Sequence, residues 1–486
     1  MSAGRDRRGA RRAAPLGAVL ALTGAVGMAV AQGRPGAEAR NPSLTLGLSL
    51  GVEVDDDRAG LLTGLGLDYV TATREQRLAF SLDADALLDG DGFDRDAFSP
   101  RLGLDYAFDN GVSLLTLSAD LSRREVDGLV FVLAPEDGEG APGPDGSDDV
   151  LQPGEVGTVE DDGTLETRRL SLGMELFRTD PVGLELGAAL RQRDYQGTSD
   201  PDLEDAELRT LEGALRLTVA PGLTFRLTAS AATESEEGLL ESETRTRALG
   251  ASVAWQATPT VALSLGIQNA RREETRNVLA AVDGTPVATG ARETVENAGL
   301  TFDAALVRAR PNGEQSLALG RRLTDERSIY DLSVGRALAL PGGGSLQGSV
   351  GLSAFEDGDA IGIATLAYRT ELRPGAPFQA SLSRRALTDD DDEDIARTDL
   401  RLSYGVPLTP VSRASLALGV SRVDVVDGFE PDSTGGSVTL GYDRALSPDW
   451  SLSARYTVAA SRDAGARTER DDRVSLTLGR TFDLSP

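Results

Sequence analysis

The sequence predicts an all-β protein: a single large closed antiparallel up-and-down transmembrane β-barrel of about 22 strands, within a range of about 18 to 24. Two observations support this prediction. Apolar and polar residues alternate through most of the chain; near the C-terminus, Leu452, Ala454 and Tyr456 alternate with Ser453 and Arg455. A period of two indicates strands with one apolar face. The links between strands are alternately short and long, which is typical of outer-membrane barrels with short periplasmic turns and long extracellular loops.

Each predicted strand is long enough to cross a bilayer at a tilt of about 45°, and an even number of strands returns both termini to the periplasm. In chain order, the predicted strands cover residues 43–54, 61–72, 77–88, 98–108, 112–123, 166–179, 182–192, 207–219, 222–232, 245–256, 260–270, 295–308, 314–323, 329–339, 345–355, 361–372, 377–387, 396–406, 412–423, 436–446, 450–460 and 473–482.

The links between these strands fall into two groups. If the chain starts in the periplasm, the tight links all fall on the periplasmic side; they are residues 109–111, 180–183, 220–222, 310–313 and 341–344. Their prolines and glycines provide the backbone angles that tight turns require. The acidic links, which are residues 234–237, 389–394 and 471–472, fall on the opposite side. We therefore expect the extracellular loops to be strongly acidic.

The N-terminus predicts an exported protein. Five arginines between Arg5 and Arg12 precede an apolar stretch that ends in an A-x-A type cleavage site at Ala29-Val30-Ala31. We assign residues 1–31 to a signal peptide, 32–42 to a short periplasmic segment and 43–486 to the barrel. The alternative is a membrane anchor, because the apolar stretch approaches the length that spans a bilayer. Export combined with spanning strands predicts the bacterial outer membrane.

Two long links stand out. Residues 124–165 contain a stretch rich in Gly, Pro and Asp, preceded by the apolar run Leu129–Leu133. Residues 271–294 contain Asp283-Gly284, which is a two-residue hairpin signal. Each link either stands outside as an extracellular hairpin or folds into the lumen as a constriction, and the sequence leaves both arrangements open.

Composition excludes several classes of function. The formal net charge is -28, with no cysteine and no histidine, and every basic residue is an arginine. Nucleic acid is not an expected partner, because phosphate binding needs clustered basic charge. Cysteine nucleophiles, lysine imines and histidine-ligated zinc are excluded, as is any reaction that needs a histidine base. Only carboxylate chemistry remains, so we expect no enzyme and no cofactor.

Two acidic runs, residues 89–94 and 389–394, contain the oxygen ligands that calcium prefers. The first run lacks the terminal glutamate of an EF-hand loop, and the second lacks a glycine that would shape a loop. We therefore assign no metal site. The alternative is a solvated loop, or one that bridges lipopolysaccharide through divalent ions.

The alternation also assigns each side chain to a face of the barrel wall. The residues expected to touch lipid are Leu102, Leu104, Tyr106, Phe108, Leu170, Leu172, Met174, Leu176, Val261, Leu263, Leu265 and Ile267. Charged alternates must face away from lipid, because an outward arginine costs about 2–4 kcal/mol at mid-bilayer. The lumen-lining candidates are Asp105, Glu185, Glu212, Asp303, Asp331, Asp399, Asp443, Arg101, Arg216, Arg226, Arg369, Arg401 and Arg455.

Two interpretations of this charged lining remain open. Opposed acidic and basic strips across a water-filled constriction would orient polar solutes. Alternatively, Asp–Arg pairs between neighbouring strands hold the wall together. Arginine suits either role because its planar fork pairs with carboxylates in two-point geometry.

The hairpin at residues 440–456, together with the similar cadence at residues 402–410, resembles those of porin-type outer-membrane barrels of proteobacteria. The final strand resembles the C-terminal signal that such proteins use for membrane insertion, with Phe482 as its aromatic residue. The sequence departs from that pattern, because residues 483–486 follow the aromatic residue. The resemblance implies an architecture rather than a function.

These observations together predict a porin-like outer-membrane channel for passive diffusion of small polar or cationic solutes through a charged lumen. The alternatives are an exopolysaccharide export conduit, a sealed structural or surface-display barrel, and a soluble β-sandwich or solenoid. Expected partners are outer-membrane lipid, lipopolysaccharide, the barrel-assembly machinery and small solutes; the oligomeric state is left open. Barrels of about 22 strands are normally plugged, and residues 32–42 leave no room for an N-terminal plug. The channel prediction therefore needs fewer strands, a loop-blocked lumen or a wide pore.

Overall fold

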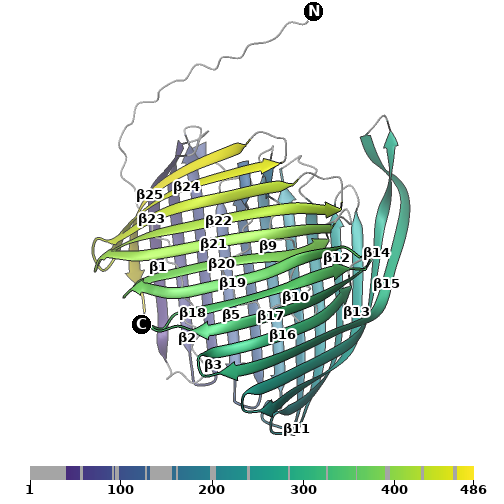
Figure 1. The fold of residues 1–486 in the computed structure, drawn as a ribbon. Helices are drawn as coiled ribbons and strands as arrows, with labels where there is room; N and C mark the ends of the chain where they lie inside the picture. The colour runs from purple at the N-terminus through teal and green to yellow at the C-terminus, as the bar shows by residue number, and fades with distance from the viewer. Residues whose placement is uncertain are drawn as a thin grey trace, which may run out of the picture.

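The computed structural model is a closed antiparallel β-barrel of 22 strands (Figure 1), which confirms the predicted fold class and strand number. Among the described residues, no helix is long and apolar enough to cross a membrane. The structure describes residues 40–54, 59–89, 92–93, 98–125, 128–131, 156–159, 163–197, 204–237, 241–282, 285–323, 327–356, 358–388, 394–427, 432–463 and 468–485. The predicted signal peptide, and most of the segment expected to follow it, lie outside these residues.

The barrel strands follow one another around the wall in chain order. They are β1 (Arg40–Val54), β2 (Ala59–Ala72), β3 (Gln76–Asp89), β5 (Ser99–Asp109), β6 (Leu114–Glu125), β9 (Thr164–Leu176), β10 (Val182–Gln196), β11 (Asp205–Ala220), β12 (Leu223–Glu237), β13 (Ser242–Thr258), β14 (Val261–Val282), β15 (Thr285–Arg310), β16 (Gly313–Leu323), β17 (Ser328–Ala339), β18 (Ser345–Phe355), β19 (Ala360–Arg373), β20 (Ala376–Thr388), β21 (Asp394–Thr409), β22 (Ser412–Asp427), β23 (Ser433–Ala445), β24 (Trp450–Asp463) and β25 (Glu469–Asp483). The short β4 (Gly92–Phe93) pairs antiparallel with the end of β3, and β7 (Gly128–Phe131) pairs with β8 (Val156–Val159) in a separate hairpin.

The first and last strands close the barrel. Thr45–Val54 of β1 pair antiparallel with Val474–Asp483 of β25 without a register shift. Beyond this seam, Leu484 donates its amide to the carbonyl of Leu44 at 2.8 Å. The residues after the final aromatic therefore continue the seam. Closure removes both sheet edges, which is the condition for a sheet to span a bilayer.

The wall has one apolar face, and this face is exposed. Leu249 is 69% exposed, Val350 67% and Leu211 62%. The strand register places these and the other exposed Leu, Val and Ile side chains on one surface around the whole barrel. Exposure of this kind is unfavourable in water and favourable against lipid acyl chains. The protein is an outer-membrane barrel with this face toward lipid.

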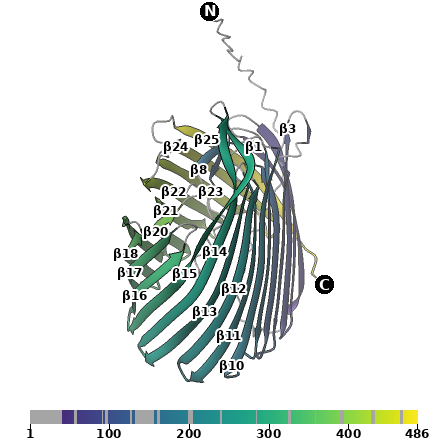
Figure 2. The ribbon, with the colours of Figure 1, turned by 90° about the vertical axis from the view of Figure 1, so that its right-hand side faces the viewer.

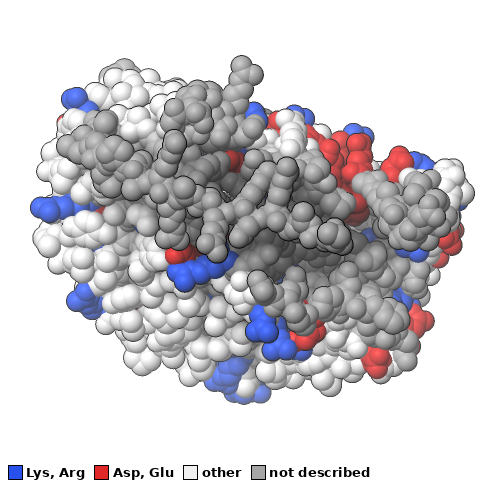
Figure 3. Space-filling model, turned by 90° about the horizontal axis from the view of Figure 1, so that it is seen from above, with Lys and Arg blue, Asp and Glu red and all other residues white. Residues whose placement is uncertain are grey.

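Strand order places the five tight links named above at one end of the barrel, the short-turn end, as predicted (Figure 1). Gly111 and Gly222 have φ of 85° and 80° in two of these turns, a conformation that only glycine adopts without strain. At the opposite end, acidic and basic side chains are interspersed around the rim (Figure 3). Two acidic runs predicted to be links are strand ends instead, because residues 234–237 belong to β12 and residues 471–472 to β25.

The two long links behave differently. The β7–β8 hairpin, which interrupts the chain between β6 and β9, contacts β23, β24 and β25 on a distant part of the wall (Figure 2). It therefore reaches over the opening at the end of the barrel opposite the short turns, which we call the loop-end opening. The β14–β15 hairpin instead rises beyond the rim (Figures 1 and 2), where its strands continue to pair up to Val282 and Thr285. This second link stands outside the lumen.

One carboxylate fastens the projecting hairpin to the neighbouring link. Glu241 accepts hydrogen bonds from Asn277 of β14 at 3.0 Å and from Arg292 of β15 at 2.7 Å. These two hydrogen bonds, first from Asn277 and then from Arg292, hold the pKa of Glu241 below its usual value of 4.5. A carboxylate with a lowered pKa stabilises the folded arrangement at higher pH, and this stabilisation is lost as the pH falls through the lowered pKa.

We predict that the E241Q variant exchanges the amide hydrogens of residues 276–292 faster than the parent at pH 7. Since protonation removes the same charge from the parent, this difference disappears as the pH falls below 4.5. Hydrogen exchange read by mass spectrometry measures both protein forms. E293Q, on the same hairpin, is the control. A difference between E241Q and the parent that persists unchanged at pH 3 would contradict the role of Glu241.

Candidate functional site

The inner face of the barrel wall carries the charged residues that the sequence singled out. The register places each of the thirteen lumen-lining candidates on the face of its strand opposite the exposed apolar side chains. The twelve residues expected to touch lipid occupy the apolar face. That the thirteen candidates contact a transported solute stays a prediction.

Three of the candidates form one cluster on β10, β11 and β12. Glu185 is ion-paired to Arg226, and its carboxylate lies 3.8 Å from the guanidinium of Arg216. Arg216 and Arg226 stand directly opposite each other in the strand register. Two arginines in this position repel each other, so Glu185 compensates a like-charge contact. At this cluster, the geometry therefore fits the interpretation in which charge pairs between neighbouring strands hold the wall together.

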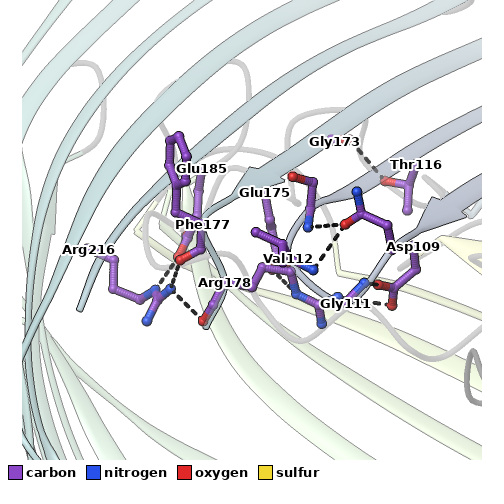
Figure 4. A network of polar contacts seen from close by, with 12 residues as sticks. Asp109, Gly111, Val112, Thr116, Gly173, Glu175, Phe177, Arg178, Glu185 and Arg216 are labelled. Carbon is purple, nitrogen blue, oxygen red and sulfur yellow. Dashed lines mark hydrogen bonds and ion pairs between the residues drawn. The ribbon is translucent and has the colours of Figure 1, made fainter. Parts of the chain in front are cut away.

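The same cluster continues into the short turns (Figure 4). Nη2 of Arg216 donates hydrogen bonds to the carbonyl oxygens of Phe177 and Arg178, at 3.2 and 3.0 Å. Arg178 in turn lies 3.0 Å from Asp109 and 3.0 Å from Glu175. Guanidinium contacts thus connect the turn ends of β5, β9 and β11 through the β9–β10 turn. This network fixes the turn end of the wall rather than presenting free charge to a solute.

Three other candidates form ion pairs on the inner face. Arg101 lies 3.3 Å from Asp120. Asp331 accepts from Arg322 at 3.3 Å and from the Ser353 hydroxyl. Asp399 is paired with Arg397 at 3.1 Å and with Arg385 at 3.7 Å, and Arg397 is 6% exposed. Of these partners, Ser353, Arg322, Arg385 and Arg397 were not among the residues that sequence analysis selected.

The remaining candidates are not brought together. Within the described part of the chain, no ion pair forms at Asp105, Asp303, Asp443, Arg369, Arg401 or Arg455. Glu212 stands in register between Gly187 and Ser230 and has an interaction of its own. The acidic runs considered for calcium, residues 89–94 and 389–394, lie largely outside the described residues.

Phe482 lies on the outer face of β25, in register with Leu46 of β1. The guanidinium of Arg480 stacks over its ring at 4.5 Å and over Trp450 at 5.4 Å. Outward arginine stacked on aromatic rings suits the polar boundary of a bilayer. The role of Phe482 as an insertion signal stays a prediction.

Sequence analysis missed a basic patch on the inner face of β6, β9 and β10. It consists of Arg124, Arg169, Arg191 and Arg193, with Tyr195 beside them. Arg191 stands in register with Arg169, and the guanidinium of Arg193 lies 5.5 Å from the Tyr195 ring centre. The sequence signal that could have revealed this patch is the alternation of Arg191, Arg193 and Tyr195, which places all three on one face of β10. Arg124 of β6 becomes a neighbour only through the pairing of β6 with β9 across the long link.

The patch gathers four arginines, of which Arg191 has an interaction of its own. Asp120 stands in register with Arg169, but it is paired with Arg101 on its other side. Glu166 and Asp194 occupy the same strand ends, yet both contact Arg168 on the outer face. A cluster of guanidinium groups inside an acidic barrel therefore favours an anion with several oxygen atoms.

Neither the family models nor the curated proteins compared with this chain include a match. Solved structures do match its fold. The ferric-catecholate import receptor Fiu from E. coli K12, in its open form, aligns with a TM-score of 0.58 at 12% identity, covering 92% of this chain and 82% of that chain. The siderophore receptor PiuA from Acinetobacter baumannii gives 0.57 at 11% identity, with coverage of 92% and 82%. The copper transporter OprC gives 0.55 at 13% identity, with coverage of 92% and 81%.

These likenesses correct the functional prediction. The barrel is built like import receptors and metal transporters, so the expectation of a porin-like passive diffusion channel for small polar or cationic solutes is wrong. The error has a physical origin: alternation and charge report the architecture and the wall, and these features are shared by barrels with different functions. The coarser conclusion, an outer-membrane β-barrel, holds.

For the cluster on β10 to β12, we predict that E185Q lowers the free energy of unfolding by about 0.5–1 kcal/mol. The effect is modest because all three charged side chains are partly exposed, and it arises because Arg216 and Arg226 lose the carboxylate between them. Urea unfolding from lipid vesicles, followed by tryptophan fluorescence, measures it. E314Q, elsewhere on the inner face, is the control. Equal stability of E185Q and the parent would show that Glu185 does not offset the arginine pair.

Proposed function

We propose that this protein is a selective outer-membrane receptor that takes up an anionic, oxygen-rich metal chelate. The observation that carries the proposal is the basic patch of Arg124, Arg169, Arg191 and Arg193 on the inner face of β6, β9 and β10. The bound chelate would present its carboxylate, phenolate or catecholate oxygens to these guanidinium groups. The reaction is binding and passage, without catalysis.

The barrel supports a solute of this size. A closed wall of 22 strands encloses more space than the 16–18 strands of general diffusion channels. The structures with the same fold include a ferric-catecholate import receptor and a siderophore receptor. Because these structures share only 12% and 11% identity with this chain, the proposed ligand follows from the residues of this chain alone.

The residue types favour a complete chelate over a bare metal ion. The chain has no cysteine, no histidine and three methionines, so it offers few of the soft ligands that copper prefers. A metal that arrives inside an organic chelate brings its own ligands. The protein then recognises only the outer, anionic surface of the complex, and arginine is suited to that task because it stays charged and donates in two-point geometry.

The loop-end opening supports selectivity. The β7–β8 hairpin reaches across this opening to β23–β25, and it belongs to the chain segment that joins β6 to β9, two of the strands that carry the basic patch. A solute that enters from the loop end therefore passes a hairpin connected to its binding strands. This connection provides a direct way for a bound ligand to influence the opening.

We predict that R169Q and R193Q each weaken binding of an anionic ferric catecholate about 10- to 100-fold, because each removes a charge-assisted contact of about 1.5–3 kcal/mol. The double variant loses more. Binding is measured as quenching of tryptophan fluorescence in detergent-solubilised protein. R369Q, on the inner face of β19, is the matched control and retains the parent affinity.

A cationic ferric hydroxamate complex serves as the second probe and should bind much more weakly than the anionic catecholate. The proposal fails if both probes bind equally well, or if R369Q weakens binding as much as R169Q and R193Q do.

A further inference from the structure

The outer face of the wall from β6 to β14 contains a groove of about 810 Å³. Its surface is almost entirely apolar, and its volume lies within the range of about 300–1,000 Å³ that ligand pockets span. The groove lies on the lipid-facing side, so it is separate from the basic patch and from the proposed uptake of a chelate.

Two adjacent register rows form the groove. The lower row crosses β9 to β14 through Met174, Leu186, Gly213, Ala229, Leu249 and Asn269. The upper row crosses the same strands through Leu172, Ala188, Leu211, Ala231, Arg247 and Arg271. Gly213, Ala229 and Ala231 are the small residues in the middle of these rows. The hollow exists because small side chains lie between larger ones on a surface that elsewhere carries leucine and valine.

The groove climbs from the periplasmic side toward the extracellular side. Leu115, at its lower end, is the second residue of β6, whereas Asn269 is the ninth residue of β14, and both strands start at the short-turn end. Because the strands are tilted, a row that follows the hydrogen-bond direction rises as it passes around the barrel. An apolar chain in the groove would thus run from near the short-turn end of the wall up toward its loop end.

Basic groups stand at the upper end only. Arg247 and Arg271 occupy adjacent register positions there. Arg271 is neutralised, with Glu296 at 2.8 Å and Glu273 at 3.8 Å. The neighbouring outward arginine of β13, Arg245, pairs with Glu243 at 2.7 Å. Arg247 is exposed, and no carboxylate among the described residues forms an ion pair with it. The groove therefore ends in an uncompensated positive charge.

We propose that this groove binds one phosphorylated glycolipid of the outer leaflet, with an acyl chain over Gly213, Ala229 and Ala231 and a phosphate against Arg247. Charge complementarity selects this occupant. An uncompensated guanidinium next to an apolar channel matches an amphiphile with an anionic head, and arginine holds phosphate in two-point geometry. The upper end lies at the extracellular boundary, where the outer leaflet presents such headgroups.

The test uses native mass spectrometry of the detergent-purified full chain, incubated with bisphosphorylated lipid A or with its dephosphorylated form. We expect the parent to retain one bisphosphorylated lipid and to retain the dephosphorylated lipid about tenfold less. R247Q loses the preference for phosphate. A231F fills the hollow and loses both lipids. The controls R336Q and A364F, with outward positions on β17 and β19, retain lipid as the parent does.

Several outcomes overturn the proposal. These are retention of both lipid forms to the same extent by the parent, unchanged phosphate preference in R247Q, or equal retention by A231F and A364F. Concentration-dependent dimers that A231F abolishes would assign the groove to a second copy of the chain and would also overturn it. Heat-modifiable migration in gels shows that each variant has a folded barrel, so loss of lipid is not confused with misfolding.

Discussion

The pairing of β1 with β25 is the constraint on which the rest of the structure depends. Inside a bilayer, each unpaired backbone amide or carbonyl costs several kcal/mol, so a spanning sheet must have no edge. Thr45–Val54 and Val474–Asp483 satisfy this requirement with an unbroken register. Closure also fixes which face is inner and which is outer. Once Leu46 and Phe482 share the outer face at the seam, the period of two assigns every residue around the wall.

This assignment lets one stretch of wall present different chemistry on its two sides. On β9 and β10, Arg169 and Arg191 face inward, while the adjacent Leu170 and Leu190 face outward in the same register. Inside, charges either compensate one another, as Glu185 does between Arg216 and Arg226, or accumulate, as they do in the basic patch. Outside, a few small residues and Arg247, unpaired among the described residues, interrupt the apolar surface. Both proposed sites are local departures from the regular wall.

The sequence predicted the strands well because alternation is a local property. It underestimated β14 and β15, expected at 260–270 and 295–308 but extending to Val282 and from Thr285. Above the membrane the strands need no apolar face, so pairing continues through Arg271–Arg276 without the alternation that marks a strand. The basic patch was missed for a different reason. Arg169, Arg191 and Arg193 lie on neighbouring strands joined by a short turn. Arg124 comes from β6, on the other side of the long link, and only the register shows that it lies near them. Function was mistaken because alternation and wall charge do not distinguish a receptor barrel from a diffusion channel.

The most direct test of the central claim is a structure of the full chain in lipid nanodiscs, determined by electron microscopy with a saturating anionic ferric catecholate. The account predicts density for one chelate on the inner face of β6, β9 and β10, in contact with Arg169, Arg191 and Arg193. Density on another part of the wall, or an empty inner face at saturation, would contradict the assignment of this barrel as a receptor that recognises its solute through the basic patch.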